Sequence, residues 1–296
     1  MSAQGEAGSP RAEAGRAGQG SDCAWDWAAL PLGRDVVLLA HDANGVAALY
    51  KPAGLLSHPN AGGDEHRALL RAPYDLQREC YELSSPEAGV TGEGQVVTKQ
   101  PAKKSSAGKA RLWLLNRLDS ATSGVLLVCH TEGLAESIRR EFRNRSVHKT
   151  YVALVFGKPA QPSALWRDRL SVEKRGGQIR TQATRSGALS AECRVRVLRS
   201  GALHGVAGHK ALSLLQLEPL TGRSHQLRVQ CARRGLPIVG DATYGDFAAN
   251  RAFAKTHGTK RLFLHSLETR FDYTWRDANY SFAATAPLPE AFGALL

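Results

Sequence analysis

The sequence lacks the long apolar runs and the paired cysteines that are typical of several large protein classes. No stretch approaches the roughly 20 apolar residues that a membrane-spanning helix needs, and the N-terminus has no apolar segment of a signal peptide. The five cysteines are widely separated, with no C-x-x-C pair and no histidine at zinc-ligand spacing. We therefore expect a cytoplasmic protein with free thiols, no membrane association and no bound metal.

Acidic residues are scarce relative to basic ones. Lys and Arg number 39 against 27 Asp and Glu, which gives a formal charge of +12 and an isoelectric point of about 9.8. An excess of this size favours a polyanionic partner, because each basic side chain that meets a phosphate releases a condensed counterion. Charge alone leaves open the alternative that the protein is merely basic.

Large apolar side chains are almost absent from residues 1–24, which predicts a disordered tail. The rest of the chain, residues 25–296, is expected to form a single globular domain, since the 43% hydrophobic content of the sequence is ordinary for globular proteins. Within it, the stretch at about 60–110 is rich in Gly, Ser, Pro and charged residues. We expect this stretch to be a partly mobile insertion.

The remaining pattern predicts many short strands and few helices. Two apolar runs between residues 36 and 51 flank a turn-forming His-Asp-Ala-Asn-Gly segment and predict a β-hairpin. Apolar spacing predicts helices at about 132–145 and 225–234. Further strands are expected at 111–115, 124–129, 151–156, 212–217 and 261–271. Strands outnumber helices, so we expect an α+β fold with a mixed, largely antiparallel central sheet and flanking helices.

Three polar segments contain the side chains best suited to chemistry: residues 116–124, 148–151 and 221–228. Each alone has an ordinary structural explanation. A carboxylate such as Asp119 between two buried strands is more often a hydrogen-bonded turn residue than a catalyst, and Tyr151 could simply fill the core. Thr-Gly-Arg before a helix could be a helix cap, although a helix N-terminus beside an arginine is also a natural phosphate site.

In this order along the chain, the three segments resemble the RluA-type family of pseudouridine synthases. The most specific matches are Arg-Leu-Asp followed by Thr-Ser-Gly at 117–124, and Thr-Gly-Arg-Ser-His-Gln-Leu-Arg at 221–228. The resemblance also includes Lys-Pro-Ala-Gly at 51–54 and the runs at 235–241 and 261–265, so it covers most of the chain. The sequence departs from the family in two ways: Asn116 stands where the family usually has His, and the insertion before it is longer than typical.

The resemblance implies the isomerisation of uridine to pseudouridine in ribosomal or transfer RNA. Enzymes of this kind break the C1′–N1 bond, turn the uracil and rejoin it through C5, so no cofactor is expected. Since the glycosidic bond is inaccessible inside a stacked helix, the uridine must be flipped out, at a cost of a few kcal/mol. We expect a monomer without the N-terminal S4-type RNA-binding domain that some relatives have, because only a short polar tail precedes the first predicted strand.

The resemblance also assigns roles to individual residues. Asp119 corresponds to the catalytic Asp, which could act as a nucleophile or as a base. Arg228 corresponds to the Arg that pairs with this carboxylate and could hold it bidentately, and Tyr151 to the aromatic ring that lies against the target base. The expected RNA-binding residues are Arg117, which would fill the gap left by the flipped base, and Lys51 and Arg223, which would contact the RNA backbone. His265, on an apolar strand, is expected to be a core residue.

One alternative function explains the charge and the insertion equally well: a non-catalytic RNA-binding or ribosome-assembly module. The carboxylate, aromatic and arginine residues argue against it, because a protein that only binds RNA has no need to bury an ion pair beside a pocket. A metal-dependent phosphodiesterase is disfavoured because the sequence has no cluster of carboxylates or histidines that could hold two metals.

Overall fold

The structure, a computed structural model, describes residues 25–83, 110–175, 178–183, 189–206 and 208–293. Within these ranges thirteen strands form one curled sheet, whose main path runs β3-β4-β5-β6-β12-β7-β11-β10-β8-β9. Among the described strands the pairing of β6 with β12 is the only parallel one. The predicted α+β fold with a mixed, largely antiparallel sheet is therefore confirmed.

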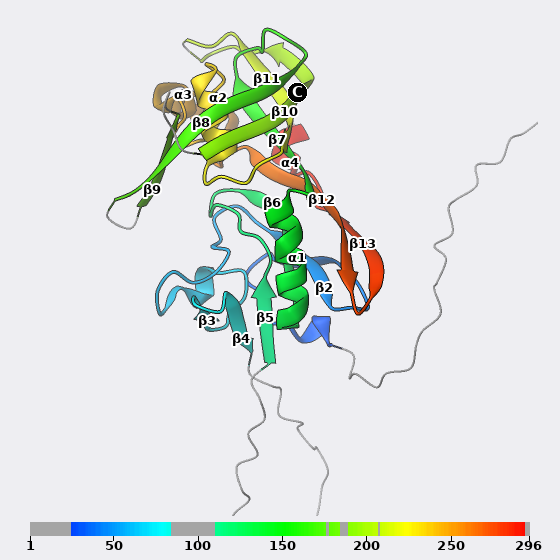
Figure 1. The fold of residues 1–296 in the computed structure, drawn as a ribbon. Coiled ribbons are helices and arrows are strands. Elements are labelled where there is room, and N and C mark those ends of the chain that lie inside the picture. The colour runs from blue at the N-terminus through cyan, green and yellow to red at the C-terminus, as the bar shows by residue number, and fades with distance from the viewer. Residues whose placement is uncertain (1–24, 84–109, 176–177, 184–188, 207, 294–296) are drawn as a thin grey trace, which may run out of the picture.

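The N-terminal half of the sheet holds the predicted hairpin and the strands on either side of the Asp119 loop (Figure 1). Its elements are η1 (Trp27–Ala29), β1 (Val37–His41), β2 (Val46–Lys51), η2 (Asp64–Arg67), β3 (Tyr74–Asp75), β4 (Cys80–Leu83), β5 (Ala110–Leu114), β6 (Ser123–Cys129) and α1 (Glu132–Asn144). Helix α1 buries Leu134 and Ile138 against the sheet and ends at Arg145, which has a left-handed backbone. The predicted helix is thus confirmed with nearly the same bounds.

Most of the C-terminal half forms the other lobe in Figure 1, with α2 and α3 packed on one face of its strands, while its last two strands run back beside the N-terminal half. Its elements are β7 (His148–Phe156), β8 (Ser163–Arg175), β9 (Gln178–Ala183), β10 (Leu189–Ala202), β11 (Ala211–Pro219), α2 (Gln226–Arg233), α3 (Phe247–His257), β12 (Leu264–Trp275), β13 (Ala278–Thr285) and α4 (Glu290–Gly293). Strand β12 pairs with β6 of one half and β7 of the other, so it joins the two halves.

Strand β6 is buried along its whole length because both of its faces are covered. Side chains alternate between the two faces of a strand. Val125 and Leu127 pack in the core beneath α1, while Leu126 and Val128 pack on the opposite side, against the N-terminal segment. This central strand therefore gives the loop before it, which contains Asp119, a rigid base.

A glycine permits the close approach of β12 to β6. Gly124 has φ of 121°, and a Cβ atom at this position would lie 2.1 Å from the carbonyl oxygen of Ser266. Any larger residue would clash with the backbone of β12. The glycine of the Thr-Ser-Gly sequence after the Asp119 loop thus has a structural reason, which is the close parallel pairing of two strands.

The first part of the predicted insertion at 60–110 packs on the core. Residues 60–83 contain η2, β3 and β4, and Leu69, Leu70 and Tyr81 are completely buried among them. The polar composition of the long segment hid these few large side chains, which are enough to attach it to the core. The rest of the insertion, residues 84–109, and the predicted tail at 1–24 lie outside the described residues.

Three further expectations concern cysteines, membranes and metals. The four cysteines in the described ranges are buried and free, as predicted. No described helix is long and apolar enough to cross a membrane. In the same part of the chain, no three His, Cys, Asp or Glu side chains are grouped closely enough to hold a metal ion.

Candidate active site

The side chains of Asp119, Tyr151 and Arg228 meet near the junction of the two halves. Asp119 lies in the loop between β5 and β6, Tyr151 on β7 and Arg228 in α2. The Nη1 atom of Arg228 donates a hydrogen bond of 3.0 Å to Oδ2 of Asp119, although 109 positions separate the two residues. The negative charge of Asp119 also acts on the Tyr151 phenol. The three residues grouped by sequence analysis therefore lie together.

Arg228 holds two carboxylates, and its bidentate partner is Asp241. The Nε and Nη2 atoms of Arg228 each donate a 2.8 Å hydrogen bond to Asp241, which leaves Nη1 for Asp119. Burial alone would lower the pKa of Arg228, but the two carboxylates more than offset it and hold the pKa above its ordinary value. The predicted Arg228–Asp119 pair exists, but through a single hydrogen bond.

Asp241 fixes the arginine in place. Its side chain is 1% exposed, and Oδ1 also accepts the backbone N–H groups of Thr243 and Tyr244 at 2.8 and 2.9 Å. Burial opposes ionisation, yet Arg228 and these N–H groups hold the pKa of Asp241 below its ordinary value. Sequence analysis placed Asp241 at the end of a matched run but gave it no role. A buried acid opposite a buried arginine becomes evident only in the fold.

Lys51 is inside the protein, so the prediction that it contacts RNA is wrong. Its side chain has no exposed surface, and Nζ donates to the carbonyl oxygens of Pro52, Leu55 and Ser120 at 3.1, 2.7 and 2.9 Å. Burial lowers the pKa of Lys51 to about 7, and the negative charge of Asp119 opposes this effect. Since all three ammonium N–H groups have protein acceptors, no donor is left for a phosphate.

Other contacts fix the backbone on both sides of Asp119. The hydroxyl group of Ser57 donates to the carbonyl of Leu118 and accepts its N–H, and the N–H of Gly54 donates to the carbonyl of Ser120. Asn116, which replaces the usual His, accepts the N–H of Leu127 through Oδ1 at 2.7 Å. Its amide therefore ties the start of the loop to β6.

Tyr151 is half-buried beside the carboxylate. Burial raises the pKa of Tyr151 to about 12; the nearby hydroxyl of Ser266 lowers it, and the charge of Asp119 raises it. The phenol is thus protonated at neutral pH. A neutral ring next to a carboxylate can offer both a stacking face and an O–H donor.

The other two predicted RNA-binding residues occupy the surface around this centre. Arg117 is exposed, and its charge acts on Tyr74, whose ring stacks on His58 with the ring centres 4.5 Å apart. Arg223 is half-buried, and its Nε donates to the carbonyl of Ser190 at 3.2 Å. RNA contact by either arginine stays a prediction.

Two histidines near the site differ in their surroundings. His265 is completely buried, as predicted, with Nδ1 2.8 Å from Oγ of Ser123, and burial lowers its pKa to about 4. His225 is half-buried, with Nε2 3.7 Å from Oδ1 of Asp119 and Nδ1 2.8 Å from the hydroxyl of Tyr244. Sequence analysis gave His225 no role, although it lies within the specific 221–228 segment.

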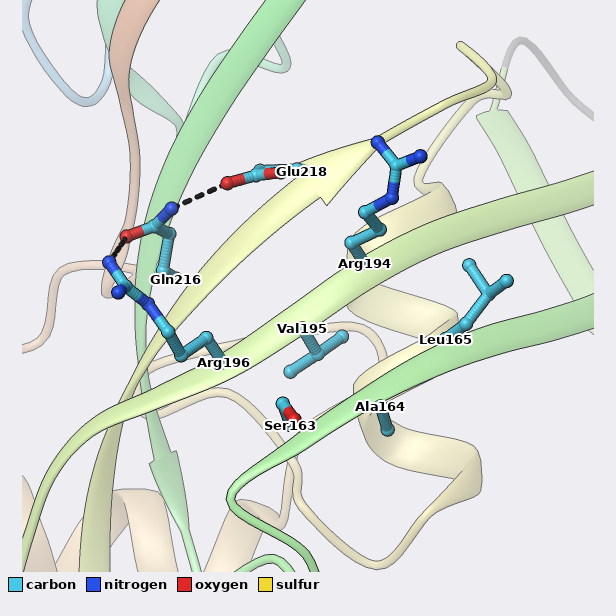
Figure 2. Close-up of a pocket in the computed structure, with 8 residues that line it drawn as sticks. All are labelled: Ser163, Ala164, Leu165, Arg194, Val195, Arg196, Gln216 and Glu218. Atoms are coloured by element: carbon cyan, nitrogen blue, oxygen red, sulfur yellow. Dashed lines mark hydrogen bonds between the residues drawn. The ribbon is translucent and has the colours of Figure 1, made fainter.

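A separate hollow lies over β8, β10 and β11, and none of the site residues above lines it. Figure 2 shows a hydrogen-bonded chain there, in which Arg196 donates to Gln216 and Gln216 donates to Glu218. The full lining is Ser163, Ala164, Leu165, Arg194, Val195, Arg196, Gln216 and Glu218. Because three of its polar side chains already pair with one another, we assign no role to this hollow.

Comparison with known proteins identifies the family. The family model described as RNA pseudouridylate synthase matches residues 45–233. An uncharacterized RNA pseudouridine synthase of Haemophilus influenzae is 31% identical over 181 residues, which cover 61% of this chain and 71% of the relative. The tRNA pseudouridine synthase C of Vibrio cholerae is 35% identical, covering 53% of this chain and 65% of the relative. The ribosomal large subunit pseudouridine synthase C of Vibrio vulnificus is 32% identical, covering 55% and 48%.

Solved structures show the same fold. Human RNA Pseudouridylate Synthase Domain Containing 1 superposes with a TM-score of 0.57 at 19% identity, covering 88% of this chain and 87% of that one. Human RNA Pseudouridylate Synthase Domain Containing 4 gives 0.55 at 21% identity, covering 86% and 90%. The match at residues 45–233 and the similarity to the curated relatives establish that the chain belongs to the RluA-type family of RNA pseudouridine synthases.

Proposed function

We propose that this protein converts specific uridines of ribosomal or transfer RNA to pseudouridine, with Asp119 as the reacting carboxylate. The main support is the state of that side chain. Arg228 holds Oδ2, the side chain is 29% exposed, and Oδ1 lies 3.7 Å from Nε2 of His225. The carboxylate is thus oriented by the protein and still accessible to a substrate. Relatives named for transfer RNA and for the ribosomal large subunit support the choice of RNA.

The ion pair suits this chemistry because both plausible routes need an ionised carboxylate. Asp119 would attack the sugar or base as a nucleophile, or remove a proton from the sugar as a base. The guanidinium of Arg228 supplies the opposite charge 3.0 Å from Oδ2 of Asp119. Since Asp241 anchors Arg228 through two hydrogen bonds, the arginine is already in position before RNA binds.

The surrounding residues would hold the flipped nucleotide. The ring of Tyr151 would stack on the target uracil, an interaction worth about 1–3 kcal/mol that offsets part of the few kcal/mol needed for flipping. Arg117 would occupy the gap left in the RNA, and Arg223 would contact its backbone. We also propose that the protein acts as a monomer. The reaction has no net redox change or group transfer, so the proposal requires no cofactor.

The test is to express the Asp119→Asn variant in cells that lack the gene and to map pseudouridine by chemical labelling and primer extension. We expect wild type to restore modification and Asp119→Asn to restore none. A matched control is Asp272→Asn, since Asp272 is exposed on β12 and should restore full modification. Undiminished modification by Asp119→Asn would refute the proposal. Cells in which even wild type adds no pseudouridine would favour a non-catalytic RNA-binding module.

A further inference from the structure

His225 combines an unusual backbone with a side chain that faces the carboxylate. It directly precedes α2 and has φ of 54° and ψ of 15°, in the left-handed region that residues other than glycine rarely adopt. Such strain persists only where the surrounding structure imposes it, and it is concentrated at functional sites. Here it accompanies an imidazole placed between Asp119 and Tyr244.

The hydrogen bonds on the far side of the ring are compatible with a proton on Nε2. The hydroxyl oxygen of Tyr244 accepts the backbone N–H of Thr181 at 2.9 Å and lies 2.8 Å from Nδ1 of His225. The phenol can then donate its own hydrogen to Nδ1. A neutral imidazole that accepts at Nδ1 has its proton on Nε2.

The other ring nitrogen, Nε2, faces the oxygen of Asp119 that Arg228 does not hold. Nε2 lies 3.7 Å from Oδ1, while Arg228 binds Oδ2 at 3.0 Å. A separation of 3.7 Å is longer than a hydrogen bond, but contacts in active sites are often long without substrate and shorten when it binds. A movement of less than one ångström would give the carboxylate a second donor.

Charged groups on several elements face the pair formed by His225 and Asp119. Burial lowers the pKa of His225; Asp119 and Asp241 raise it, and Arg228 lowers it, with a net value below the ordinary one. His225 is therefore neutral at pH 7. Besides His225 and Arg228, Asp119 faces Lys51 of β2 and Tyr151 of β7.

We infer that His225 is a positioning residue: its Nε2–H donates to Oδ1 of Asp119 when the uridine is bound and fixes the carboxylate between His225 and Arg228. The inference rests on the proposed function and deepens it. A neutral donor at this position stabilises the ionised carboxylate without adding a second cation to the site. Tyr244 contributes through His225: its hydroxyl group donates to Nδ1 and so keeps the proton on Nε2.

The test compares His225→Ala, His225→Gln and Tyr244→Phe in steady-state kinetics on the RNA identified by mapping. For His225→Ala we expect kcat to fall about 10- to 100-fold, the effect of losing one hydrogen bond to a charged group, with little change in KM. His225→Gln should recover part of kcat through its amide N–H, and Tyr244→Phe should lower kcat less than His225→Ala.

His209→Ala is the matched control, because His209 also pairs with an aspartate, Asp246 at 3.1 Å, but does so away from Asp119. It should keep the wild-type kcat. Wild-type kcat in His225→Ala would overturn the inference, as would a Gln variant no more active than the Ala variant. These results require an active wild type. A wild-type protein that forms no pseudouridine would instead refute the proposed function.

Discussion

Two carboxylates share one guanidinium at the centre of this molecule, and their surroundings give them different roles. Asp241 is 1% exposed and takes two N–H groups from Arg228 and two from the backbone. Asp119 is 29% exposed and takes one N–H from Arg228. The buried acid therefore serves the structure by orienting the arginine, while the accessible acid can meet a substrate.

Lys51 provides a test at the scale of a single residue. Lys51→Met keeps much of the side-chain volume but removes the donors to three carbonyl groups. We expect the free energy of unfolding, measured with a chemical denaturant, to fall by about 2–4 kcal/mol, because buried acceptors lose their partners.

Lys158→Met is the control for this variant, since Lys158 is exposed and should change stability by less than about 0.5 kcal/mol. One outcome would instead support the original prediction that Lys51 contacts RNA. If Lys51→Met were as stable as wild type but bound RNA more weakly, then Lys51 would have to reach the substrate.

For single residues, the sequence predicted the candidate catalytic side chains but not the residues that hold them in place. Asp119, Tyr151 and Arg228 belong to ordered motifs that a resemblance can recognise. The burial of Lys51, the pairing of Asp241 with Arg228 and the position of His225 depend on which distant segments come together. The local sequence around a lysine or a histidine does not show whether its side chain lies at the surface or in the interior.

The elements were largely predictable because their patterns are local. Short apolar runs indicated the hairpin, β6 and β7, and a helical apolar face indicated α1. The last predicted strand, 261–271, differs from β12, which spans Leu264–Trp275, since its far end is set by pairing with β13. Residues 60–83 were assigned to an insertion because composition averaged over a long segment conceals a few buried side chains.

The close parallel pairing of β6 and β12 gives a test at the scale of secondary-structure elements. In Gly124→Ala the new Cβ would lie 2.1 Å from the backbone of Ser266, so one of the two strands must move. We expect a loss of at least about 2 kcal/mol in unfolding free energy, from overpacking together with backbone strain. Pseudouridine formation should also fall, because β6 supports the loop that contains Asp119.

Gly205→Ala separates the steric effect from the backbone effect. Gly205 also has positive φ, 76°, but a Cβ there meets no atom within 4 Å. Its loss of stability should be clearly smaller and its activity normal. Equal losses of stability in the two variants would show that the approach of β12 to β6 is not the constraint at Gly124.

For the whole molecule, the central feature is a single curled sheet whose two halves meet beside the site. The sequence predicted the α+β class, but not the strand order, because pairs such as β6 with β12 join residues far apart in the chain. The same folding brings Asp119 from one half to Arg228 in the other. The net charge of +12 is a property of the whole chain and agrees with an RNA substrate.

The central claim, that Asp119 drives isomerisation of uridine in RNA, can be measured with RNA labelled with tritium at C5 of uridine. Because C5 becomes bonded to the sugar and its hydrogen passes to water, purified wild-type protein should release tritium. Asp119→Asn should release none while still binding the RNA through its basic surface. Tritium release by Asp119→Asn at the wild-type rate would contradict the account.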